Sequence, residues 1–156
     1  MRFESLAAWR NHDAVKGRKL VVTNGCFDLL HVGHVTYLEE AKRLGDVLLV
    51  GINGDEAVTA LKGKGRPINN ASDRSLVIAA LQSVDAVCIF SDATATRFLT
   101  TARPDVYVKG GDYQLETLNQ EERRAVENAG GSIIILPLTR GKSTSALVQK
   151  LGGQQS

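Results

Sequence analysis

The sequence has little of what marks exported, membrane-spanning or nucleic-acid-binding proteins. Its 156 residues include two cysteines, Cys26 and Cys88, which are too few for a disulfide framework. No apolar run approaches the roughly 20 residues of a membrane span, and residues 1–19 lack a basic-then-apolar leader. The net charge is only +2, without a concentrated basic face. We therefore expect a cytoplasmic protein with no nucleic-acid and no membrane partner.

What is present fits one globular domain. Hydrophobic residues make up 43% of the chain and charged residues 23%, which is ordinary for a folded protein. The length is sufficient for one core. We expect a single domain over 1–156, with an N-terminal helix and lead-in over 1–18 and a frayed tail over 152–156.

Short apolar runs alternate with helical patterns along the chain. Strands are predicted at residues 19–24, 46–53, 85–90, 105–110 and 132–138. Helices are predicted at 35–45, 54–63, 72–84 with Ser72 as N-cap, 94–102, 114–129 and 143–151. Strands that are apolar on both faces and separated by helices predict an α/β fold with a doubly wound, five-stranded parallel sheet.

Ligands of such sheets bind beyond the carboxyl ends of the strands. The first strand is followed by NGCFDLLHVGH, in which His31 and His34 flank Gly33. A helix beginning near Val32 would direct its free N–H groups there, so the segment predicts an anion site with two imidazole donors. A helix start with two incidental histidines is the alternative. A zinc site would need a third ligand, and the remaining histidine is His12.

Four stretches, NGCFDLLHVGH, LKGKGRPIN, RPDVYVKGGDY and LPLTRGKSTS, resemble the HxGH nucleotidyltransferases, the cytidylyltransferase-like group. The resemblance covers about residues 19–151. Within the group, the chain is most similar to the D-glycero-β-D-manno-heptose 1-phosphate adenylyltransferases. It implies a Rossmann-like nucleotidyltransferase fold. It also implies a reaction in which AMP is transferred from ATP to the sugar phosphate and pyrophosphate is released. The resemblance further implies that Mg²⁺ is carried by the ATP phosphates rather than by a protein metal site, and that the protein is a homodimer.

The resemblance also implies roles for individual residues, taken by their numbers in this sequence. The implied catalytic residues are His31, His34, Lys62 and Asp28. The implied nucleotide-binding residues are Asn24, Gly25, Cys26, Phe27, Gly33, Lys109, Gly110, Asp112, Ser143 and Thr144. The implied ligands of the substrate phosphate are Lys64, Arg66 and Arg74.

Several alternatives stay open at this point. Asp28 fits a helix-capping acid, Lys64 fits a solvated loop, and Arg74 fits an ion pair with Asp73 or Asp55. The KGGDY stretch also fits a tight turn with a flanking ion pair. GKST resembles a phosphate-binding P-loop, but Leu136 stands where that motif needs glycine.

Other functions remain open as well. A cytidylyltransferase for glycerol 3-phosphate or ethanolamine phosphate and an FMN adenylyltransferase share the HxGH signature. An inactive nucleotide-binding regulatory module is the alternative from another class.

Overall fold

The computed structural model describes residues 1–111 and 117–137. It contains a five-stranded, all-parallel sheet in the order β3-β2-β1-β4-β5. The strands are β1 (Leu20–Gly25), β2 (Val47–Asn53), β3 (Ala86–Phe90), β4 (Val106–Gly110) and β5 (Ser132–Leu136). The predicted α/β fold and its five parallel strands are confirmed. Chain progression reverses between the neighbouring strands β1 and β4, which makes the ends of these strands the expected ligand crevice.

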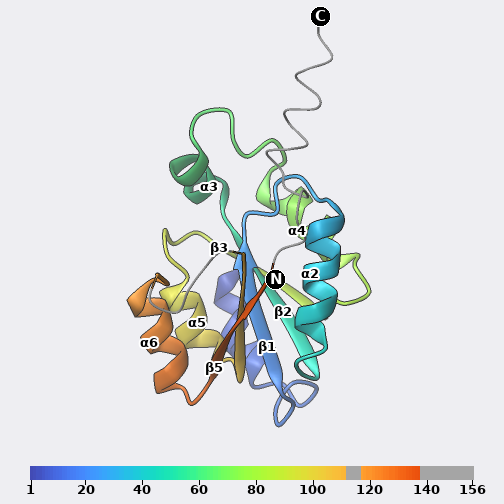
Figure 1. Cartoon of the computed structure of the whole chain (residues 1–156), viewed down its shortest axis with the longest axis vertical. Coiled ribbons are helices and arrows are strands. Elements are labelled where there is room, and N and C mark those ends of the chain that lie inside the picture. The colour runs from blue at the N-terminus through green and yellow to red at the C-terminus, as the bar shows by residue number, and fades with distance from the viewer. Residues whose placement is uncertain (112–116, 138–156) are drawn as a thin grey trace, which may run out of the picture.

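Helices cover both faces of the sheet (Figure 1). One face carries α1 (Leu6–Arg10), α5 (Thr96–Ala102) and α6 (Gln120–Asn128), and a short 3-10 helix, η1 (Phe3–Ser5), precedes α1. The other face carries α2 (Val32–Lys42) and α4 (Ala71–Ala79). The remaining helix, α3 (Asp55–Lys62), stands above the carboxyl ends of the strands. The helix α3 therefore lies above the carboxyl ends of the strands, where the ligand crevice is expected.

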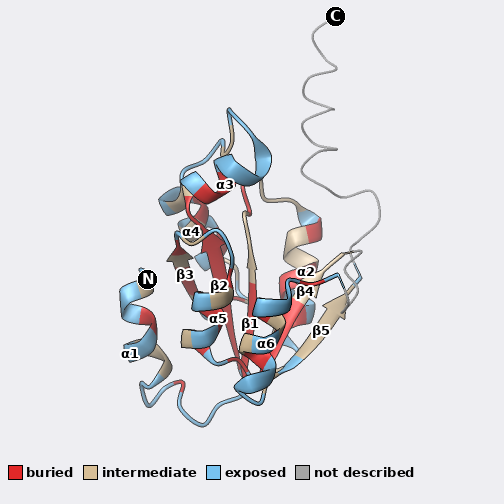
Figure 2. Cartoon of the chain, turned by 90° about the vertical axis from the view of Figure 1, so that its left-hand side faces the viewer, coloured by how far each residue is buried: buried red, intermediate tan, exposed pale blue. Residues whose placement is uncertain are grey.

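The sheet interior is apolar on both faces, as the unbroken hydrophobic runs predict. Every residue of β2 is buried, and Figure 2 shows the central strands as the most deeply covered part of the molecule. Side chains alternate between two cores. Leu20 and Val22 pack under α5 and α6, whereas Val21 packs under α2 and α4. This alternation decides which face each polar residue at a strand end will meet.

Three aspartates connect neighbouring strands near the amino ends of the strands, opposite the ligand crevice. Each one precedes a strand and accepts a hydrogen bond from the backbone N–H of another segment. Asp46 accepts from Lys19 at 2.8 Å, Asp85 from Leu48 at 2.6 Å, and Asp105 from Leu20 at 2.7 Å. These contacts fix the alignment of the first four strands away from the ligand crevice.

Several helix boundaries differ from those expected. α2 begins at Val32 rather than at residue 35 and ends at Lys42, and α4 ends at Ala79 rather than at residue 84. Asn70, not Ser72, caps α4: its side chain accepts from the N–H of Asp73 at 2.9 Å, which places Ser72 inside the helix. Similarly, α6 begins at Gln120 because Asn119 accepts from the first free N–H groups of that helix. The expected helix over 143–151 and the tail over 152–156 lie outside the described residues. Among the described residues, no helix is long and apolar enough to span a membrane.

Candidate active site

The two histidines of HVGH lie together where α2 begins. His31 is the N-cap of α2, and its Nδ1 accepts from the N–H of Gly33 at 3.1 Å. This bond leaves the proton of a neutral ring on Nε2, the nitrogen that is available to a ligand. The His31 and His34 rings stack with their centroids 3.9 Å apart. The predicted pairing of two imidazoles with the amide-rich end of a helix is therefore present in the structure.

His34 is the more buried of the two rings. The edge of Phe27 packs against it, with the ring centroids 5.2 Å apart. Burial, then the neighbouring His31 and Lys62, lower the pKa of His34 from 6.5 to about 4. His34 is thus neutral at pH 7 in the free protein. Its Nδ1 is buried with no hydrogen-bond partner among the described residues, which is uncommon for a buried polar atom.

The segment between β1 and α2 has an unusual backbone at Phe27. Phe27 adopts a positive φ of 47°, a conformation that residues other than glycine rarely adopt. Gly25 lies directly beneath this ring, since a Cβ on Gly25 would be 3.0 Å from Phe27 Cε2. Such strained turns concentrate at functional sites. Gly25, Cys26 and Phe27 are therefore placed as a tight turn beside the histidines.

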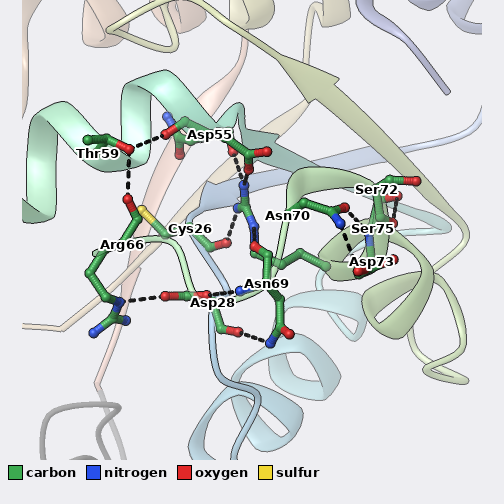
Figure 3. A network of polar contacts seen from close by, with 12 residues as sticks. Cys26, Asp28, Asp55, Thr59, Arg66, Asn69, Asn70, Ser72, Asp73 and Ser75 are labelled. Atoms are coloured by element: carbon green, nitrogen blue, oxygen red, sulfur yellow. Dashed lines mark hydrogen bonds and ion pairs between the residues drawn. The ribbon is translucent and has the colours of Figure 1, made fainter. Parts of the chain in front are cut away.

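Asp28 fastens this turn to the segment that joins α3 and α4. Its buried carboxylate accepts from Arg66 Nε at 2.6 Å and from the N–H groups of Ile68 and Asn69 (Figure 3). Although burial alone would raise it, these two amides and the guanidinium hold the pKa of Asp28 below its ordinary value. Asp28 is not the cap of α2, which is His31. A role of Asp28 toward phosphate or Mg²⁺ stays a prediction.

Arg74 ties three segments beneath the site. Its side chain is 1% exposed, and every guanidinium nitrogen donates to a protein oxygen. The acceptors are the backbone carbonyls of Cys26, Asn53 and Asn69 and the carboxylate of Asp55. The ion pair with Asp55, one of the open alternatives, is thus present. A substrate-phosphate role for Arg74 stays a prediction, and the observed contacts favour a structural one.

Three of the predicted cations, Lys62, Lys64 and Arg66, lie at the end of α3 or in the segment after it. Lys62 is the last residue of α3, and its charge acts on both His34 and Cys26. Arg66 Nη2 is buried and has no hydrogen-bond partner among the described residues. Lys64 is exposed and lines a polar cavity of about 490 Å³ with Asp55 and Thr59. Lys62 and Arg66 thus bring positive charge toward the turn after β1, and Lys64 lies farther out.

A second cavity, of about 240 Å³, lies where β1 and β4 end, and we call it the switch-point cavity. Its lining includes Asn24, Gly25 and Cys26 from the end of β1 and Lys109 from β4. Burial raises the pKa of the Cys26 thiol, against the effect of Lys62 and Arg74. Cys26 therefore contributes a neutral thiol and its backbone rather than a nucleophile.

The sequence analysis missed three residues around the switch-point cavity. Asn53 ends β2 and lines this cavity. Glu122 also lines it, and it is buried and hydrogen-bonded to the buried Tyr107 at 3.1 Å. Asn53 could have been found from its place at a strand end; the other two depend on contacts between distant segments. Gly110 ends β4 as expected, while Asp112, Ser143 and Thr144 lie outside the described residues.

The arrangement suits binding and neutralising a polyphosphate. It combines the positive end of a helix, two imidazoles and nearby cations, the groups that stabilise charge developing on phosphoryl oxygens. No group of three metal-ligating side chains occurs within residues 1–111 and 117–137. His12, the third histidine, is exposed and lies after α1, away from the histidine pair in the chain.

A parallel sheet with this site at the carboxyl ends of its strands is typical of the nucleotidyltransferases, which are enzymes of Rossmann-like fold. The cytidylyltransferase-like family profile matches residues 22–149, and the chain belongs to that family.

Similar proteins agree with this assignment. The chain is 50% identical over 135 residues to the bifunctional protein HldE of Pseudomonas paraeruginosa, covering 86% of this chain and 28% of that protein. It is 46% identical over 147 residues to the bifunctional protein HldE of Koribacter versatilis, covering 94% of this chain and 29% of that protein. The chain therefore spans less than a third of the length of these relatives.

Two solved structures share the fold. A lipopolysaccharide core biosynthesis protein from Thermoplasma volcanium is 28% identical with a TM-score of 0.64, covering 81% of this chain and all of that one. The pantoate-β-alanine ligase of Francisella tularensis is 16% identical with a TM-score of 0.62, covering 89% of this chain and 66% of that one, and this likeness concerns the fold alone.

Proposed function

We propose that this enzyme transfers AMP from ATP to D-glycero-β-D-manno-heptose 1-phosphate, giving ADP-heptose and pyrophosphate. The observation that carries the proposal is the stacked pair of His31 and His34 at the start of α2. The family supports nucleotidyl transfer. The choice of ATP and of a heptose phosphate rests on the VKGGDY and GRPIN stretches and on the similarity to the HldE proteins.

In this mechanism, an oxygen of the sugar phosphate attacks the α-phosphorus of ATP directly. The bond from the α-phosphorus to the bridging oxygen breaks, and pyrophosphate leaves with that electron pair. His31 Nε2–H and the start of α2 would meet the α- and β-phosphates as these gain charge, and would lower the barrier by electrostatic stabilisation. Lys62 and Arg66 add positive charge at the mouth of the site. No covalent enzyme intermediate is required.

Mg²⁺ is proposed as the metal that accompanies ATP. Its two positive charges would neutralise the phosphates. The described residues offer no cluster of three metal ligands, and the carboxylate of Asp28 is already engaged by an arginine and two amides. We therefore propose that the ATP phosphates, rather than protein carboxylates, bring the metal into the site.

The decisive experiment is a substrate panel read by pyrophosphate release and by the mass of the product. ATP and CTP are each combined with heptose 1-phosphate, glycerol 3-phosphate, ethanolamine phosphate or FMN, with Mg²⁺. We expect turnover with ATP and heptose 1-phosphate. Turnover with CTP and glycerol 3-phosphate, and none with ATP and heptose 1-phosphate, would overturn the assignment of the substrates and leave the family assignment intact.

A further inference from the structure

Glu122 is a buried carboxylate that lies outside the histidine cluster. It stands in the first turn of α6, three residues after the N-cap Asn119, and is only 8% exposed. In a capping box, a glutamate at this position turns back to the N–H of the N-cap residue. Here the carboxylate instead reaches away from its own helix. It accepts from the N–H of Ala95 at 2.9 Å and from the Tyr107 hydroxyl at 3.1 Å.

These contacts connect Glu122 to the wall of the switch-point cavity. Lys109 Nζ lies 3.6 Å from Glu122 Oε2 and donates to Asn24 Oδ1 at 3.1 Å. The Tyr107 hydroxyl is 2.6 Å from the same Asn24 oxygen. One network thus runs from α6 through β4 to Asn24 at the end of β1, and Asn24, Lys109 and Glu122 all line the switch-point cavity. Figure 2 shows α6 lying over this part of the sheet.

The network also sets the charge of the lysine. Burial lowers the pKa of Lys109, and the neighbouring Glu122 carboxylate acts in the opposite direction. The other titratable groups that face Lys109 among the described residues are Tyr107, whose ring centroid is 5.2 Å from Nζ, and Cys26 in the same cavity. Neither supplies a negative charge at neutral pH. Glu122 is therefore the described group that stabilises the protonated form of Lys109.

We propose that Glu122 is a positioning residue of the substrate site, which holds the Lys109 ammonium at the wall of the switch-point cavity. An anionic group of a substrate then meets a donor that is already oriented and charged. Glu122 itself does not face the reacting atoms. The inference rests on the proposed function, because it assumes that an anionic substrate contacts Lys109.

The first test needs no substrate. Lysine Nζ resonances are titrated by NMR in the wild-type chain, and the Lys109 signal is identified by its loss in Lys109→Arg. Glu122→Gln keeps the shape of the side chain and removes its charge, so we expect the pKa of Lys109 to fall by about one unit. The control is Glu121→Gln, an exposed residue of the same helical turn. Glu122→Asp, which withdraws the charge by one methylene group, should give a smaller shift in the same direction.

An unchanged pKa of Lys109 in both Glu122 variants would overturn the inference. This result does not depend on which substrate the enzyme uses. A wild-type chain that fails to turn over heptose 1-phosphate would count against the proposed function only.

The second test separates positioning from a general structural role. Lys109→Met should raise the KM of one substrate on the order of tenfold or more, the size of one lost charge-assisted hydrogen bond. Glu122→Gln should raise the KM of the same substrate less, most strongly at high pH, with little change in kcat. The double variant should be no worse than Lys109→Met, because Glu122 acts through that lysine. Additive effects, or a fall in kcat alone, would contradict the inference.

Discussion

The contacts of Asp28 allow a stability prediction with a sharp magnitude. Asp28→Asn keeps the volume of the side chain but removes the charge that pairs with Arg66 at 2.6 Å, and it places an amide NH₂ among N–H donors from residues 68 and 69. The Asp28 side chain is 1% exposed, so water cannot replace these partners. Loss of one partner of a buried, hydrogen-bonded pair costs about 3–5 kcal/mol.

The measurement is urea unfolding at pH 7, followed by the fluorescence of Trp9, the single tryptophan. Asp28→Asn should lower the free energy of unfolding by about 3 kcal/mol or more, with an unchanged m-value. Asp13→Asn is the control, because Asp13 is an exposed carboxylate and surface changes usually alter stability by about 0.5 kcal/mol or less. A loss below about 1 kcal/mol for Asp28→Asn would refute the reasoning.

The ion pair of Asp28 and Arg66 should also make the unfolding free energy depend on pH. The pKa of Asp28 is lowered in the folded state, so its stabilising contribution is complete above the unfolded value of about 3.9. It is lost as the pH falls through the folded value, because the unfolded state then binds more protons. The difference in unfolding free energy between wild type and Asp28→Asn should therefore shrink below about pH 4. A constant difference from pH 7 to pH 3 would contradict the ion pair.

Three further predictions follow from the site and the sheet. His34→Ala should lower kcat by about 10²–10³-fold with little change in the urea midpoint, and near-wild-type turnover would remove His34 from catalysis. The pKa of His34 falls from 6.5 to about 4 on folding, so the unfolded state binds more protons than the folded state between these pH values. The unfolding free energy should therefore rise with pH from about 4 to 6.5. The rise should be smaller in His34→Gln. Gly51→Ala should lower the unfolding free energy by about 1–3 kcal/mol, since its Cβ would lie 2.7 Å from Phe98 Cε1; an unchanged midpoint would show that Phe98 yields freely.

The fold and the centre of the site could be predicted because their signals are local. Unbroken apolar runs marked the five strands, and parallel strands bring their carboxyl ends to one edge. The HVGH stretch contained the cap of α2 and both imidazoles within four residues. The two rings did not have to be brought together by distant parts of the chain, so their pairing was readable from spacing.

The rest depended on contacts between segments far apart in the sequence. Arg74 appears in the sequence as a cation in the first turn of a helix, and only the fold shows that three carbonyls and a carboxylate surround it. Glu122 appears as one of several acids on a polar helix, yet it contacts Tyr107 and Ala95 in other elements. Asn70 and Ser72 are both good helix caps, and the backbone alone decides between them.

The three aspartates at the far edge of the sheet have a consequence for how this enzyme can change. Asp46, Asp85 and Asp105 hold the strand alignment at the amino ends of the strands, opposite the candidate site. The carboxyl ends do not have to hold this alignment, so the asparagines, lysines and glycines there can vary while the sheet stays in register. A change of substrate specificity, by evolution or by design, should therefore conserve the three aspartates and substitute residues at the carboxyl ends of the strands.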